Sequence, residues 1–295
     1  MKLLIQPDDG VMPLVQAVKH AKKSIDIVVF RFDQAELEKA LAAAVARGVA
    51  VRALIAHTNR GGERNLRKLE MRLLEAGVTV SRTADDLTRY HGKMMVVDDT
   101  LFVLGFNYTK LDIERSRSFG IVTRDKPLVK EACALFTADS LRQPYEPGHD
   151  RLVVSPESSR ELLTNFIKKA KRQLLIYNTK VSDRLVLRAL QDRLKAGVEI
   201  QIIGKADKRL AGVETRKLAD LRLHVRAMVR DSTAAFVGSQ SLRKLELDGR
   251  REVGVIVTDS RIARKIQSVF EADWKDSAPK AATEVAKAEV LSAAR

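Results

Sequence analysis

Two residues, His91 and Lys93, combine side chains that can act together on a phosphate group. An apolar run follows them, and residues 93–97 are predicted to form a strand. Side chains two positions apart on a strand point to the same face, so the imidazole and the ammonium would converge on one point. A neutral imidazole can attack phosphorus, and a fixed ammonium can neutralise the charge on its oxygens. The pair is therefore a candidate phosphate site.

The same spacing occurs a second time in the chain. His224, Arg226 and Asp231 repeat the pattern His-x-Lys-x4-Asp with Arg in place of Lys, and a glycine follows seven residues after the Asp of each copy. Asp98, the first Asp, has the opposite strand parity from Lys93, so we expect it to accept backbone hydrogen bonds at the following turn rather than touch a substrate. One copy alone is equally typical of a solvated His and Lys on an edge strand, but two matched copies favour a site.

These two motifs resemble those of the phospholipase D superfamily, in which each half of the chain contributes His-x-Lys-x4-Asp followed by Gly-Ser-x-Asn. The resemblance runs from about residue 2 to residue 274. It implies a duplicated α/β fold, with two mixed sheets flanked by helices, whose His motifs meet across a pseudo-two-fold axis at the interface between the halves, in the centre of a merged sheet. It also implies a covalent phosphohistidine, with His91 as nucleophile and His224 as general acid and then base. The sequence leaves open which of the two histidines attacks.

The resemblance assigns roles to further residues. Lys93, Arg226 and Asn107 would bind the non-bridging oxygens, with Ser239 and Ser241 in the second Gly-Ser-x-Asn segment. This sequence departs from the family pattern in three ways. Arg226 has a planar guanidinium in place of the compact ammonium of Lys, and Ser241 lacks the amide of Asn. In the first half, the segment at residues 105–107 lacks the Ser and is one residue shorter than Gly-Ser-x-Asn. Three interpretations follow. The second half forms a working catalytic site, or it only binds substrate beside an impaired catalytic centre, or the whole protein binds phosphate without catalysis. Retention of both histidines favours the first interpretation.

Two halves can be recognised by internal similarity. Residues 21–25 match 170–174 and residues 47–51 match 196–200, both at a separation of 149 positions, whereas the His motifs are 133 apart. We therefore divide the chain into a first half (1–142), a linker (143–151) containing Pro and Gly, a second half (152–275) and a flexible or helical tail (276–295).

Each half shows the same order of elements. A helix (13–22; 158–171) precedes an apolar strand (25–30; 174–178), and a second helix and strand follow. Helices that alternate with short apolar strands indicate layered α/β sheets with helices on their faces.

Between residues 47–51 and its His motif, the first half has about 16 more residues than the second half has between residues 196–200 and its own motif. These extra residues lie around Arg60 and Arg64. Paired glycines beside two arginines are typical of a mobile loop that closes over an anionic substrate, and equally of a plain surface loop before a helix at residues 63–76.

Composition narrows the classes of function. With 53 Lys and Arg against 38 Asp and Glu, the net charge of +15 favours an anionic partner, either acidic lipid, nucleic acid or a phosphorylated small molecule. A single cysteine excludes an internal disulfide framework and a Cys-rich metal site. The sequence contains no cluster of His, Cys and carboxylate residues with metal-ligand spacing, so it implies neither a metal nor another cofactor. Aromatic residues make up only 5%, which counts against a dedicated single-strand binder.

No apolar run reaches the roughly 18 residues needed to span a bilayer, and the N-terminus lacks a signal-peptide core. We therefore expect a cytoplasmic or peripheral membrane protein. Because both motifs lie in one chain, no obligate oligomer is required.

The leading hypothesis is a phospholipase D-type phosphodiesterase or phosphatidyltransferase, similar to cardiolipin synthases, that cleaves the head-group phosphodiester of a phospholipid. A nuclease of the same superfamily is the second hypothesis, since long apolar loops for acyl chains are not evident. The third is a basic adaptor that binds anionic lipid or nucleic acid without turnover.

Overall fold

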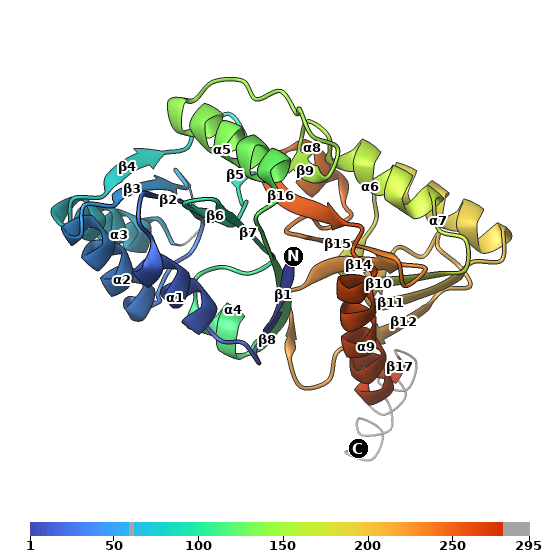
Figure 1. The fold of residues 1–295 in the computed structure, drawn as a ribbon. Coiled ribbons are helices and arrows are strands. Elements are labelled where there is room, and N and C mark those ends of the chain that lie inside the picture. Colours follow the sequence, from blue (N-terminus) through green and yellow to red (C-terminus); the bar gives the residue numbers. More distant parts are fainter. Residues whose placement is uncertain (59–61, 280–295) are drawn as a thin grey trace, which may run out of the picture.

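The computed structural model describes residues 1–58 and 62–279, which form two α/β halves that meet at the centre of the molecule (Figure 1). Each half contains one mixed sheet, parallel in one part and antiparallel in the rest. The expected class, a duplicated α/β fold with two mixed sheets flanked by helices, is therefore confirmed.

The first sheet has the strand order β1-β8-β7-β6-β2-β3-β4. Strands β2, β3 and β4 are parallel to one another, and the remaining neighbours in this order are antiparallel. Its strands are β1 (Lys2–Gln6), β2 (Ser24–Val29), β3 (Ala50–Ile55), β4 (Thr79–Arg82), β6 (Met94–Val97), β7 (Thr100–Leu104) and β8 (Ser116–Thr123).

The second sheet repeats this arrangement, with the order β12-β11-β10-β14-β15-β16. Strand β9 pairs with β16 as β1 pairs with β8, and β17 adds to the β12 edge. Its strands are β9 (Leu152–Ser155), β10 (Gln173–Val181), β11 (Glu199–Ala206), β12 (Glu214–Lys217), β14 (Arg226–Arg230), β15 (Ala234–Gly238), β16 (Arg250–Val257) and β17 (Ala278–Pro279).

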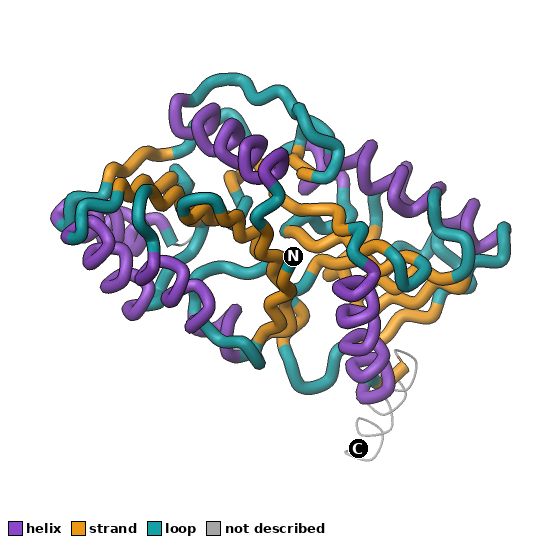
Figure 2. The backbone as a smooth tube through the Cα atoms, viewed as in Figure 1, coloured by secondary structure: helices purple, strands orange, loops and turns teal. Residues whose placement is uncertain are grey.

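Helices cover the outer faces of both sheets, and further helices lie between them (Figure 2). The outer helices are α1 (Met12–His20), α2 (Ala35–Ala46) and α3 (Glu63–Glu75) in the first half and α6 (Ser159–Lys168) and α7 (Arg184–Lys195) in the second. Those that contribute to the central apolar cluster are α5 (Lys126–Leu141) and α9 (Ser260–Asp276). Two short helices, α4 (Lys110–Glu114) and α8 (Lys244–Asp248), precede β8 and β16.

Alternation along the strands explains these layers. In β6, Met94 and Val96 face the central cluster, whereas Met95 and Val97 face the outer helices. Because both faces are covered, the strand is apolar throughout, as the sequence of residues 94–97 requires.

Two short strands cross between the halves. Strand β5 (Arg89–Tyr90) belongs to the first half in sequence but pairs with β16, and β13 (Arg222–Leu223) of the second half pairs with β8. The expectation of one merged sheet is therefore wrong, because the two sheets stay separate and exchange these strands. Since each crossing strand ends just before a motif histidine, the exchange brings both histidines to the interface.

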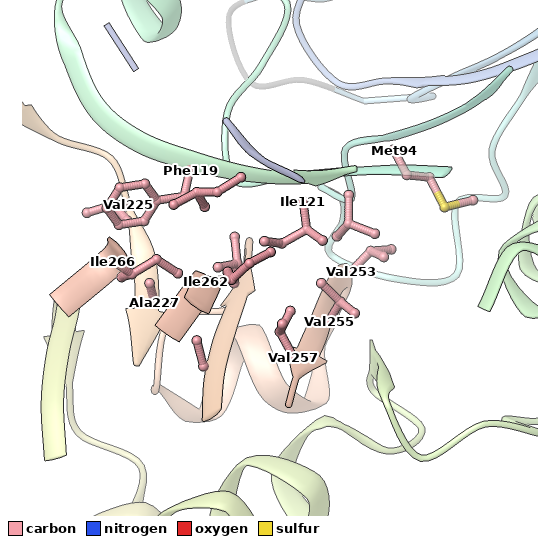
Figure 3. Packing of buried hydrophobic residues seen from close by; sticks show 14 of the residues in the cluster. Met94, Phe119, Ile121, Val225, Ala227, Val253, Val255, Val257, Ile262 and Ile266 are labelled. Atoms are coloured by element: carbon pink, nitrogen blue, oxygen red, sulfur yellow. The ribbon is translucent and has the colours of Figure 1, made fainter. Parts of the chain in front are cut away.

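The interface also has an apolar core. Figure 3 shows Phe119 and Ile121 of β8 facing Val225, Ala227 and the apolar side chains of β16. Two ion pairs cross between the halves at equivalent positions, Arg117 with Asp273 (2.9 Å) and Arg251 with Asp139 (3.0 Å).

Some boundaries differ from those expected. The predicted helices at 13–22 and 158–171 end earlier, at His20 and Lys168, and the strand expected at 93–97 begins at Met94. Of the tail expected to be flexible or helical, residues 278–279 instead pair with β12, and residues 280–295 lie outside the described part.

Candidate active site

One cavity of about 450 Å³ lies where the halves meet, and both motif histidines line it. The pairing of the crossing strands positions them. Arg250 and Arg251 of β16 pair with residues 89–90, so His91 follows opposite Glu252, and the His91 N–H donates to the Arg251 carbonyl over 2.7 Å. By the same register, Ser116 and Arg117 of β8 pair with residues 222–223, so that His224 follows opposite Ser118.

The His91 ring is held by a carboxylate of the other half. Its Nδ1 lies 2.8 Å from Oε2 of Glu252, which is fully buried, and Phe30 meets the ring edge-on at 4.5 Å. A carboxylate acceptor fixes the proton on Nδ1 and leaves the lone pair on Nε2. Burial, together with the nearby charge of Lys93, holds the pKa of His91 well below its ordinary value, so the ring is neutral at pH 7.

Lys93 is fully buried beside His91. Its Nζ lies 2.9 Å from both ring nitrogens and donates to the His91 carbonyl over 2.5 Å. No carboxylate lies within 4.0 Å of this amine in the described part of the chain, and burial lowers its pKa to about 7. An incoming phosphate oxygen would supply the missing counter-charge.

His224 has different partners. Its Nε2 lies 3.5 Å from Oδ2 of Asp112, while its buried Nδ1 has no hydrogen-bond partner among the described residues. Ser118 stands where the counterpart of Glu252 would be, and its buried hydroxyl likewise has no described partner. Burial, together with the charges of Arg226 and Lys93, lowers the pKa of His224 well below its ordinary value. The two imidazoles are thus chemically inequivalent.

Arg226 occupies the position equivalent to Lys93. Its guanidinium donates to the His224 carbonyl, as Lys93 does to that of His91, and its Nε donates to Ser241 Oγ over 3.2 Å. The Ser241 hydroxyl in turn lies 3.0 Å from Thr179 Oγ1. The serine in place of the family's Asn therefore anchors the longer cation at the cavity wall.

Asn107 and Ser239 hold parts of the site in place. The Asn107 amide and backbone N–H both donate to Asp112, and Asn107 lines the cavity. Ser239 bonds the backbone of Val253, next to Glu252.

The two motif aspartates lie away from the cavity lining. Asp98 accepts three backbone N–H groups of residues 22–24, and Asp231 accepts three of residues 171–173. The donors belong to the loops that enter β2 and β10, not to the turn after each motif strand. Burial acts to raise the pKa of each carboxyl, but the backbone donors outweigh it and the pKa is lowered.

Within the described residues, the loop expected to close over the substrate does not contribute to the cavity lining. Arg64 is exposed in the first turn of α3 and does not line the cavity, and Arg60 lies outside the described part. In residues 1–58 and 62–279, no group of three His, Cys, Asp or Glu side chains is arranged to hold a metal ion. Nor does any helix in these ranges have the length and apolarity to cross a bilayer.

Sequence reasoning missed Glu252, Asp112 and the cationic lining. One signal for Glu252 was present, since it directly precedes the apolar residues 253–257 of the same strand, where a buried carboxylate requires a partner.

Comparison with known proteins decides the family. The family model described as "Cardiolipin synthase, PLD-like domain" matches residues 14–140 and 163–274. The chain belongs to this phospholipase D-like family. No protein of curated function matches the sequence.

Solved structures share the phospholipase D-like fold. Polyphosphate kinase from Porphyromonas gingivalis aligns with a TM-score of 0.78 at 19% identity, covering 93% of this chain and 47% of that one. Phosphatidylserine synthase from Haemophilus influenzae aligns with a TM-score of 0.70 at 11% identity, covering 94% and 87%. This phospholipase D-like chain thus spans about half the length of the polyphosphate kinase.

Proposed function

We propose that this protein is a phosphodiesterase or phosphatidyltransferase that cleaves the head-group phosphodiester of a phospholipid through a phosphohistidine and passes the phosphatidyl group to water or an alcohol. The observation that carries the proposal is one cavity lined by two neutral imidazoles, of which His91 is held by Glu252 with its Nε2 lone pair unprotonated. Family membership supports the reaction class, and the similarity to a phosphatidylserine synthase supports the lipid substrate.

In the first step His91 Nε2 attacks phosphorus. The P–N bond forms as the P–O bond to the leaving group breaks, and His224 gives its proton to the leaving oxygen. In the second step His224 takes a proton from water or an alcohol, whose oxygen attacks phosphorus and breaks the P–N bond. We assign the nucleophile to His91 because its Nδ1 has a carboxylate partner, which stabilises the positive charge that develops on the ring.

Lys93 and Arg226 would stabilise the negative charge on the phosphate oxygens. Each donates to the carbonyl of its own histidine, which supports a role for one cation of each half in binding the reacting phosphate. The anionic substrate also raises the proton affinity of His224, because it offsets the burial and the charges of Arg226 and Lys93 that lower the pKa of this imidazole.

The test is turnover of bis-p-nitrophenyl phosphate by the wild type, His91→Ala and His224→Ala. We expect hydrolysis by the wild type and a loss of at least about a thousandfold in both variants, because each removes an essential group. Mass spectrometry of quenched wild type should find the phosphorylated adduct on His91, and added primary alcohol should divert the product. Equal background in all three proteins would refute the proposal and leave only the basic adaptor.

A nuclease of the same superfamily is the second candidate, favoured by the net charge of +15 and the cationic cavity. Cleavage of DNA or RNA by the wild type but not by His91→Ala, together with binding that falls steeply with salt, would select it over the lipid enzyme.

A further inference from the structure

We propose that Lys180 and Lys205 form a second anion subsite beside the reacting position, and that the substrate carries a further phosphate group bound there. The substrate class is a phospholipid in which a second phosphate lies close to the reacting one, as in a lipid diphosphate. This inference rests on the proposed function, since it extends the same cavity.

A β-bulge builds the subsite. Strands β10 and β11 pair in register as far as Asn178 with Gly204 and resume at Val181 with Ala206, so Thr179 and Lys180 oppose Lys205 alone. Bulges redirect side chains and are frequent next to active sites. Here the residues of the bulge, Thr179, Lys180 and Lys205, all line the cavity.

Glycine makes this bulge possible. Gly204 has φ +140°, and a Cβ at this position would lie 1.7 Å from the Asn178 carbonyl oxygen. Any other residue would force the two strands apart. In the first half, β2 and β3 pair regularly to their ends at Val29 and Ile55, so the bulge is particular to the second half.

The bulge is connected to the proposed phosphate site. The Thr179 hydroxyl lies 3.0 Å from that of Ser241, which accepts from Arg226 Nε over 3.2 Å. Lys180 follows Thr179 directly, so the second subsite adjoins the cation that would hold the reacting phosphate.

The charge of the cavity exceeds what one phosphodiester requires. Besides Arg31 and Arg89, its lining contains six cationic side chains but only two carboxylates, those of Asp112 and Glu246, and these already pair with arginines. Within the part of the chain that the structure describes, Lys180 and Lys205 have no carboxylate within 4.0 Å. A phosphodiester contributes one negative charge, so several cations would face each other unless the ligand carried more.

The lining favours a compact phosphate group over a nucleic-acid strand. Phe30 is the one aromatic ring among the described lining residues, and His91, Lys93, Arg31 and Arg89 already pack against it. No open ring is left on which a base can stack.

The test measures binding of tripolyphosphate and of orthophosphate to the full-length protein by titration calorimetry. The wild type should bind tripolyphosphate at least about tenfold more tightly than orthophosphate, since charge-assisted hydrogen bonds to two lysines add to the affinity. In Lys180→Ala with Lys205→Ala, that preference should disappear. The matched control, Lys168→Ala with Lys195→Ala, removes two exposed lysines of the outer helices and should keep it.

Two results would overturn the inference. One is an unchanged tripolyphosphate preference in the Lys180 and Lys205 variant. The other is loss of binding to a twelve-nucleotide oligothymidylate with tripolyphosphate unaffected, which would assign the lysines to nucleic acid. Binding is measured without turnover, so a wild type that binds tripolyphosphate but hydrolyses nothing would refute the proposed function and leave the subsite standing.

Discussion

At the scale of single residues, the main feature of this site is its asymmetry. The duplication places Glu252 opposite His91 but Ser118 opposite His224, so that within the described residues only the first of these two motif histidines has a carboxylate on Nδ1. A carboxylate in this position fixes the tautomer and stabilises an imidazolium, which a nucleophile needs as its bond to phosphorus forms. A general acid and base must give up its proton in turn, and a strong carboxylate partner would oppose this.

This asymmetry predicts the effect of Glu252→Gln. The amide keeps the shape but no longer stabilises positive charge on His91, so kcat on bis-p-nitrophenyl phosphate should fall about a hundredfold or more, with a small change in KM. Ser118→Ala at the equivalent position is the control and should change kcat less than about threefold. Equal losses in both variants would contradict the assignment of His91 as nucleophile.

At the scale of elements, each motif aspartate connects its own strand to a neighbouring strand by hydrogen bonds. Asp98 and Asp231 both have φ 52°, and each gathers three backbone N–H groups from the loop that enters the neighbouring strand. Each motif strand is thereby fixed to β2 or β10, which sets the position of its histidine.

Replacing Asp98 by Asn keeps a residue that tolerates positive φ but weakens three charge-assisted bonds. We expect a loss of about 1–2 kcal/mol in the free energy of unfolding at pH 7, measured by urea denaturation. Because the pKa of Asp98 is lowered in the folded state, this difference is complete above about pH 4 and fades as the pH falls through the folded-state value. The control is Asp99→Asn at the exposed neighbouring position, whose free energy of unfolding should stay within about 0.5 kcal/mol of the wild type. A similar loss in both variants would contradict the role of Asp98 in connecting the strands.

At the scale of the whole molecule, equivalent contacts made by each half on the other join the two halves. Strands β5 and β13 are exchanged, and Arg251 and Arg117 each reach an aspartate on the helix that closes the opposite half. The cavity exists only where these contacts join the halves, so the site depends on the interface.

Arg251→Met tests this dependence. Arg251 and Asp139 are 7% and 6% exposed, and removing one partner leaves a buried charge. The expected loss is about 3–5 kcal/mol in the free energy of unfolding, measured by chemical denaturation. Adding Asp139→Leu should recover part of the loss, because it removes the buried carboxylate of Asp139, and only Glu157, the more exposed second partner of Arg251, then lacks its arginine. A loss below about 1 kcal/mol in Arg251→Met would show that the pair does not hold the halves together.

The sequence by itself determined the duplication, the layered α/β class and the two motifs. These follow from short-range rules, since strand alternation, apolar runs and repeated spacing are readable along the chain. The expected boundary at 143–151 and the catalytic roles of His91 and His224 stay predictions.

Only the tertiary structure decided which groups meet. Glu252 reaches His91 across 161 positions, and Lys180 enters the cavity because a bulge opposite Lys205 turns it there. The lowered pKa values of both imidazoles also arise from burial between the halves. Such contacts depend on how two distant strands pair and how two sheets pack, and local residue patterns do not encode either choice.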